Sequence, residues 1–223
     1  MSYFEEVESP ENYEPKCLCV LVLDVSGSMT GRPIEQLNKG LQTFHQEVMQ
    51  DFVASNRLEV SIVIFSSQVQ CIQEPALITN VQMPKLTTGG TTKMAEAIQM
   101  AIEQIDSRKQ WYKNTGQKYY RPMIVLMTDG EPDRNQNLAA IGQSVQEGVS
   151  GKHFSFYAIG VQGYNHQKLA QICPPNVPPL PLDGYKFSDF FKWLSNSIGT
   201  ITKSRQGDTI ALPPVSGWTQ TEV

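Results

Sequence analysis

The sequence predicts an α/β fold with a doubly wound, mostly parallel sheet, one short antiparallel edge strand, and helices on both faces. Continuous apolar stretches at residues 17–24 and 122–128 are typical of strands that are buried on both faces. Segments with apolar residues at every third or fourth position predict amphipathic helices between the strands. Because the two patterns alternate along 223 residues, we expect one large domain.

The first predicted strand reads CLCVLVLD and ends abruptly at Asp24. Ser26 and Ser28 follow in a turn that contains glycine. In open α/β sheets, ligands bind in the crevice outside the carboxyl ends of the strands. We therefore interpret Asp24, Ser26 and Ser28 as the first half of an oxygen-lined site.

The next segment predicts a helix of about five turns, opened by Pro33, whose missing N–H group is not needed there. Its apolar face consists of Ile34, Leu37, Leu41, Phe44, Val48 and Phe52. Residues 58–65 predict a second strand. Residues 69–73 follow too closely for a crossover helix, so they predict an antiparallel edge strand in a hairpin.

A glycine pair between threonines precedes another predicted helix, which begins near Met94. Thr91 and Thr92 stand at the start of that helix, after glycines that permit a tight backbone approach. Residues 107–121 mix aromatic and basic side chains. We interpret them as a frayed helix end and a linker whose aromatic residues pack on the domain, with a partner-binding patch as the alternative.

The strand at residues 122–128 repeats the pattern of the first strand, because Asp129 and Gly130 follow it directly. Later segments predict a helix near Leu138, a strand at 154–161, a short helix at 166–172 and a last helix from Phe187 to Ile201. Residues 174–184 contain too many prolines for a central strand. We assign residues 1–16 to an acidic N-terminal arm, 17–204 to the domain, and 205–223 to a tail that packs on the domain or trails from it.

The composition limits the classes of partner. A net charge of −4 gives no electrostatic reason to expect nucleic acid or an anionic membrane. No apolar stretch approaches the roughly 20 residues that span a bilayer, and the first residues lack the regions of a signal peptide. The four cysteines contain no C-x-x-C pair, which favours reduced thiols over zinc or disulfides. We expect a cytoplasmic monomer.

Two predicted strands end in acids, and hydroxyl groups accompany both. If the loops meet at one edge of the sheet, Asp24 and Asp129 line an all-oxygen pocket together with serine and threonine hydroxyls. Hard cations such as Mg²⁺ prefer such oxygen ligands. Two carboxylates leave the ion partly unsatisfied, so a carboxylate from a partner protein would complete its coordination.

Three motifs together resemble the von Willebrand factor type A (vWA) family: D-x-S-x-S at residues 24–28, G-x-T-x-M at 90–94, and T-D-G at 128–130. The resemblance implies a Rossmann-like vWA fold with a metal-ion-dependent adhesion site (MIDAS) that holds a divalent cation, Mg²⁺ first and Mn²⁺ or Ca²⁺ as alternatives. Thr92 is preferred to Thr91 because G-x-T-x-M-x-x-A-I then runs in register. The implied metal ligands are Asp24, Ser26, Ser28, Thr92 and Asp129.

Further stretches resemble the bacterial tellurium-resistance-associated (TerY-like) branch of this family. They are LVLDVSGSMTGRPIEQLNKGL, WYKNTGQKYYRP, LPLDGYKFSDFFKWLSNS and a late LPP followed by GW. The resemblance implies an adaptor in a stress-response system whose partner is a kinase-like protein or a metal-dependent phosphatase encoded nearby. The branch often has threonine and aspartate where this chain has Asp133 and Arg134. We expect Glu131 and Asp133 to be solvated loop acids, with a supporting role next to the metal ligands as the alternative.

The alternative function is a metal-assisted phosphatase or hydrolase that uses Asp24 as its nucleophile. A haloacid-dehalogenase-like phosphatase requires a second aspartate two residues later as general acid, and Ser26 holds that position. The patterns G-x-x-x-x-G-K-[ST] and G-x-S-x-G are also absent from the sequence. The sequence therefore favours a non-catalytic, metal-dependent protein-binding module.

Overall fold

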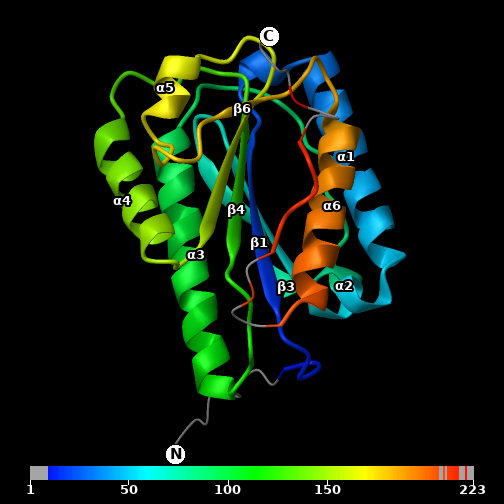
Figure 1. Ribbon diagram of the computed structural model, residues 1–223. Coiled ribbons are helices and arrows are strands. Elements are labelled where there is room, and N and C mark those ends of the chain that lie inside the picture. The colour runs from blue at the N-terminus through cyan, green and yellow to red at the C-terminus, as the bar shows by residue number, and fades with distance from the viewer. Residues whose placement is uncertain (1–9, 206–207, 209, 216–218, 220–223) are drawn as a thin grey trace, which may run out of the picture.

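The computed structural model describes residues 10–205, 208, 210–215 and 219. Within these residues, six strands form one sheet in the order β3-β2-β1-β4-β5-β6 (Figure 1). Neighbouring strands are parallel except for β3, which is antiparallel to β2 at one edge. The strands are β1 (Cys17–Asp24), β2 (Leu58–Phe65), β3 (Val69–Leu77), β4 (Met123–Thr128), β5 (Ser155–Gly160) and β6 (Leu180–Pro181).

Helices cover both faces of the sheet, which confirms the predicted fold class (Figure 1). One face, on the left of the figure, carries α3 (Met94–Thr115), α4 (Leu138–Ser150) and α5 (His166–Ala170). The other carries α1 (Arg32–Met49), α2 (Phe52–Arg57) and α6 (Phe187–Lys203). Two short 3₁₀ helices, η1 (Gly27–Met29) and η2 (Ile78–Asn80), lie in connecting loops.

Strand β1 is the centre of the molecule, between β2 and β4. Leu21 and Leu23 belong to the core beneath α1 and α6, whereas Val20 and Val22 belong to the core beneath α3. Successive side chains of a strand point to opposite faces, so an uninterrupted apolar sequence is what a strand between two helical layers requires. The parallel neighbours of β1 end at the same edge of the sheet, where the candidate site is located.

The first long helix is shorter than predicted. Helix α1 ends at Met49, and Phe52, which we expected on its apolar face, is 82% exposed at the start of α2. Asp51 explains the break, because its carboxylate accepts hydrogen bonds from the backbone N–H groups of Val53 and Ala54 at 3.0 and 3.2 Å. An aspartate cap stabilises the beginning of a new helix at this point.

Residues 107–121 do not form a frayed helix end, because α3 continues to Thr115 and stops at Gly116, whose φ of +69° suits glycine. The packing of the aromatic residues is confirmed. Tyr112 is 0% exposed, stacks on Tyr119 with ring centroids 5.0 Å apart, and donates a 2.5 Å hydrogen bond to the Glu59 carboxylate. A regular helix is retained here because Tyr112 is anchored in the core.

Both edges of the sheet differ in length from the sequence prediction. Strand β3 continues to Leu77, beyond the expected residues 69–73, and the proline-rich passage contributes the two-residue edge strand β6. Described residues of the tail pack beside this edge. The backbone carbonyl of Pro213 accepts a 2.8 Å hydrogen bond from the indole of Trp193 on α6. The Thr219 hydroxyl donates a hydrogen bond to the backbone carbonyl of Pro181 in β6. Residues 1–9 of the predicted arm and most of the end of the tail lie outside the described residues.

Of the four cysteines, Cys71 and Cys173 are partly buried. Cys17 and Cys19 are buried on the same face of β1, and burial raises the pKa of the Cys17 thiol to about 12. In the part of the chain that the structure describes, no helix has the length and apolar character needed to cross a membrane.

Candidate functional site

Asp24 is held rigidly at the carboxyl end of β1. Its side chain is 0% exposed, and both carboxylate oxygens accept hydrogen bonds: Oδ1 from the Ser26 backbone N–H at 2.8 Å and Oδ2 from the Thr128 hydroxyl at 2.6 Å. Burial raises the pKa of this carboxyl to about 6, and the nearby charge of Asp129 acts in the same direction. The hydrogen bonds from Ser26 and Thr128 oppose that rise.

The two serines connect the loop after β1 to the loop after β4. Their hydroxyl oxygens, Ser26 Oγ and Ser28 Oγ, lie 3.0 Å apart. The Ser28 hydroxyl donates a 2.7 Å hydrogen bond to Oδ1 of Asp129. Burial raises the pKa of Asp129 as well, although this hydrogen bond opposes the rise. Ser26 and Ser28 therefore form a chain of hydroxyl groups from one acid toward the other.

Gly130 shows how closely the loops approach. A Cβ atom at this glycine would lie 3.2 Å from Thr92 Oγ1, 3.4 Å from Asp24 Oδ2 and 3.5 Å from Ser28 Oγ. Three oxygens from two separate segments, the end of β1 with its following loop and the loop before α3, thus surround one small volume beside Gly130, which the absence of a side chain leaves open. The arrangement brings all five predicted site residues together, since Ser26 and Asp129 are joined to this group through Ser28.

The structure separates the roles of the two adjacent threonines. Thr92 is 6% exposed and its hydroxyl faces the oxygens around Gly130. Thr91 is exposed, and its backbone N–H donates to the Ser67 hydroxyl at 2.9 Å. Gly90 makes this loop possible, because its φ is +83° and a Cβ atom would lie 2.4 Å from Ser67 Oγ.

Gln136, which the sequence did not indicate, and Asp133 together fix the position of Thr92. Gln136 bridges to α3: its side-chain Nε2 donates to the Thr92 carbonyl at 2.6 Å, and its Oε1 accepts from the Ala95 N–H at 2.7 Å. The Asp133 carboxylate accepts a 3.2 Å hydrogen bond from the Thr92 backbone N–H, and the Asp133 backbone N–H donates a 3.1 Å hydrogen bond to the Thr92 carbonyl. The expectation that Asp133 is merely a solvated loop acid is therefore wrong.

Glu131 has a different environment from Asp133. Its side chain is 60% exposed and forms a 2.8 Å ion pair with Lys168, which fits the expected solvated loop acid. No sequence pattern pointed to Gln136, since a glutamine eight residues after the end of a strand has no characteristic spacing. Thr128 was within the T-D-G motif, but its hydrogen bond to Asp24 depends on the pairing of the strands.

The donor set consists of carboxylate and hydroxyl oxygens without histidine or thiol. Among the described residues, no three side chains of the His, Cys, Asp and Glu types gather as a potential metal site. Any cation at this edge of the sheet would therefore depend on two carboxylates and three hydroxyls, which suits a hard cation better than zinc. The full burial of Asp24 and the partial burial of Asp129 add a physical reason for a counter-ion, because ionised carboxylates are costly to bury alone.

The sequence matches the von Willebrand factor type A domain model over residues 19–192, and the chain belongs to this family. Proteins of this family are in general modules for protein interaction and adhesion. The match includes all five predicted site residues.

The curated relatives are parts of much larger proteins. Inter-alpha-trypsin inhibitor heavy chain H4 from Homo sapiens is 30% identical over 169 residues, which correspond to 71% of this chain and 17% of that protein. Inter-alpha-trypsin inhibitor heavy chain H3 from Bos taurus is 26% identical over 169 residues, or 71% of this chain and 18% of that protein. The chain thus spans less than about a fifth of the length of these relatives.

Solved structures share the fold at low sequence identity. The pilus adhesin SpaC from Lactobacillus rhamnosus GG superposes with a TM-score of 0.64 at 14% identity, covering 86% of this chain and 31% of that one. The ArnB paralog VWA2 from Sulfolobus acidocaldarius gives a TM-score of 0.56 at 17% identity, covering 82% and 45%. These similarities show the fold alone.

Proposed function

We propose that this protein is a non-catalytic, metal-dependent adaptor that binds a partner protein through a divalent cation. The residues that would hold the cation are Asp24, Ser26, Ser28, Thr92 and Asp129. The observation that supports the proposal is the convergence of oxygens from three loops around Gly130. When bound, the cation would supply an electrophilic centre for a carboxylate.

Mg²⁺ fits this donor set best, because it prefers oxygen ligands and commonly retains waters that leave positions open. Mn²⁺ and Ca²⁺ are the alternatives. Asp24 and Asp129 contribute two formal negative charges, and the hydroxyl groups contribute none. An Asp or Glu of the partner would supply the further negative charge, which explains how a small surface could select an acidic partner.

The biological setting that we propose is a bacterial stress or tellurium-resistance-type system in the cytoplasm. The support for this setting is the sequence resemblance of LVLDVSGSMTGRPIEQLNKGL, WYKNTGQKYYRP and the later stretches to the TerY-like branch. The partner would be a kinase-like protein or a metal-dependent phosphatase encoded nearby. The names of the relatives, which are inhibitor heavy chains and adhesins, are compatible with a binding role rather than catalysis.

A metal-assisted hydrolase that uses Asp24 as nucleophile is the second candidate. One feature disfavours it. Ser26, at the position of the general acid in haloacid-dehalogenase-like phosphatases, has no acidic proton to donate.

Direct metal binding is the first test of the proposal. Isothermal titration with MgCl₂ and MnCl₂ should give saturable binding to the wild-type protein and none to Asp24→Ala. Asp106→Ala is the matched control, because Asp106 is an exposed acid on α3 outside the site. Equal binding to wild type and Asp24→Ala, or no binding to the wild type, would refute the metal site.

Partner binding is tested separately by affinity capture from a lysate of the source cells. The baits are the wild type with Mg²⁺, the wild type with chelator, and Asp24→Ala. A protein retained by the first bait alone would support a metal-bridged adaptor. Magnesium-dependent hydrolysis of a generic phosphate ester that Asp24→Asn abolishes would instead support the hydrolase.

A further inference from the structure

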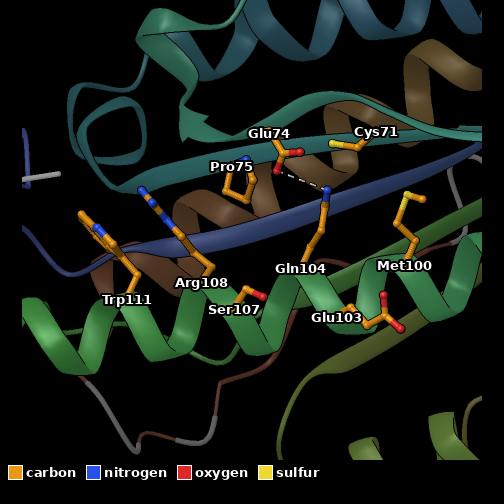
Figure 2. A pocket seen from close by; sticks show the side chains of 9 residues that line it. All are labelled: Cys71, Glu74, Pro75, Met100, Glu103, Gln104, Ser107, Arg108 and Trp111. Atoms are coloured by element: carbon orange, nitrogen blue, oxygen red, sulfur yellow. Dashed lines mark hydrogen bonds between the residues drawn. The ribbon is translucent and has the colours of Figure 1, made fainter. Parts of the chain in front are cut away.

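A cavity of about 580 Å³ lies between helix α3 and the edge strand β3, and we name it the α3–β3 groove (Figure 2). Its volume falls within the range of roughly 300–1,000 Å³ that is typical of ligand pockets. Glu74 and Pro75 line it from the strand, and Met100, Glu103 and Trp111 line it from the helix. None of its lining residues belongs to the candidate metal site.

The dimensions of the groove suit a short extended peptide. Figure 2 shows Met100 near one end and Trp111 near the other, with Pro75 and Glu74 on the opposite wall. From Met100 to Trp111 the helix rises about 17 Å at 1.5 Å per residue. An extended chain rises about 3.3 Å per residue, so the groove is as long as about five residues.

The accessible charge of the groove is negative. Glu74 and Glu103 are exposed, and within the described residues neither carboxylate forms an ion pair. The basic residue of the lining, Arg108, is occupied differently, because its guanidinium donates two 2.8 Å hydrogen bonds to the buried carboxylate of Glu59. A ligand that enters the groove therefore meets two uncompensated acids.

The remaining lining combines apolar surface with a strand edge. Met100 and Pro75 provide apolar contacts, and methionine adapts well to aliphatic side chains. The Arg108 guanidinium lies over the Trp111 ring, 3.9 Å from its centroid, and closes that end of the groove. Among the described strands, β3 pairs with β2 alone, although beside the groove Pro75 has no N–H and the Glu74 carbonyl accepts a hydrogen bond from the Gln73 side chain. An exposed strand edge is a common docking place for extended segments.

We infer that the α3–β3 groove binds a short extended segment of a partner protein in which Lys or Arg alternates with apolar residues. The basic side chains meet Glu74 and Glu103, and the apolar side chains pack against Met100 and Pro75. This second contact is separate from the cation site, so the protein engages partners through an acidic groove as well as through its metal.

The test uses the full chain and a fluorescently labelled peptide that alternates lysine with leucine, measured by fluorescence anisotropy. A peptide with glutamate in place of lysine, and one with serine in place of leucine, separate the charge from the apolar contribution. We expect saturable binding of the lysine–leucine peptide and affinities at least about tenfold lower for the other two. Absence of saturable binding at millimolar protein, or equal affinity for the glutamate peptide, would overturn the inference.

A matched pair of charge reversals locates the contact. Glu103 and Glu147 both lie exposed on helices and accept a hydrogen bond from the glutamine four residues earlier, at 2.9 and 2.8 Å. Glu103→Lys should weaken binding of the lysine–leucine peptide by about tenfold, whereas Glu147→Lys on α4 should change it less than about twofold. Equal losses in the two variants would show non-specific attraction and overturn the inference.

A chelator control separates this groove from the proposed metal site. Binding of the lysine–leucine peptide should be the same with Mg²⁺, with chelator and in Asp24→Ala. If binding of the peptide depended on the metal or on Asp24, the peptide would contact the proposed metal site, and the inference about the groove would be wrong. Failure of metal binding, in contrast, would refute the proposed function and leave the groove inference intact.

Discussion

Ser28 and Asp129 are separated by 101 residues in the chain, and the Ser28 hydroxyl donates a 2.7 Å hydrogen bond to the Asp129 carboxylate. This contact joins the loop that follows β1 to the loop that follows β4, the two strands at the centre of the sheet. It keeps one acid of the proposed metal site in a fixed position relative to Asp24.

Ser28→Ala removes a proposed ligand and the link to Asp129. We expect Mg²⁺ affinity, measured by isothermal titration, to fall by about tenfold or more, because Asp129 loses its fixed orientation. Ser28 is exposed, so the free energy of unfolding in chelator should change by less than about 0.5 kcal/mol. Ser150→Ala on α4 serves as the control, and a similar loss of affinity there would contradict the prediction.

Gln136→Ala removes both hydrogen bonds that hold Thr92 and the first turn of α3. We predict a loss of Mg²⁺ affinity of about tenfold, although Gln136 itself is not a proposed ligand. The free energy of unfolding should fall by about 1 kcal/mol. Gln136→Glu retains the acceptor for the Ala95 N–H but places a carboxylate oxygen against the Thr92 carbonyl, so a loss at least as large as in Gln136→Ala is expected. Unchanged affinity in Gln136→Ala would show that Thr92 does not need this support.

Asp24→Asn tests the cost of the buried charge in the metal-free protein. The folded-state pKa of about 6 lies above the unfolded value of about 3.9, so ionisation of Asp24 favours unfolding. The loss of folding free energy caused by ionised Asp24 is absent below about pH 4, grows as the pH rises to about 6, and is constant above that pH. At pH 7 in chelator, Asp24→Asn should therefore be more stable than the wild type by up to about 3 kcal/mol.

Mg²⁺ should reverse this order of stability. The wild-type protein gains stability by binding the cation, and Asp24→Asn gains none. The difference in melting temperature between the two proteins should therefore narrow as Mg²⁺ is added and change sign at saturating Mg²⁺. A variant that is less stable than the wild type in chelator at pH 7 would show that the hydrogen bonds of Asp24 outweigh its burial. Denaturant titrations at pH 4.5 and 7 in chelator distinguish the cost of burying the Asp24 charge from the benefit of its hydrogen bonds, because only the cost of the charge grows between these two pH values.

Asp51→Ala provides a stability change away from the site. It removes the cap that begins α2 and the ion pair with Lys203 on α6, so we expect a loss of about 1 kcal/mol in the free energy of unfolding. Lys203→Met removes the ion pair but keeps the cap, and its cost should be smaller because the pair is exposed. Mg²⁺ affinity should be unchanged in both variants. A change in affinity would indicate coupling between α2 and the site.

The amino-acid sequence by itself determined the class of fold, most of the elements and the identity of the acids and hydroxyls at the proposed site. Apolar runs and helical spacing predict local structure because neighbouring residues decide it, and β1 and β4 are apolar up to their last residues, Asp24 and Thr128. The prediction was wrong where a single side chain overrode the pattern, as when Asp51 ended α1 before Phe52.

Only the tertiary structure decided which groups meet. The register between β1 and β4 places Thr128 against Asp24, and the close approach at Gly130 turns Thr92, rather than Thr91, toward the acids. The supporting role of Gln136 and the groove between α3 and β3 have no sequence pattern, because each depends on elements brought together by the sheet. Local sequence specifies chemistry and element type, whereas long-range packing specifies distance, and the proposed site requires both.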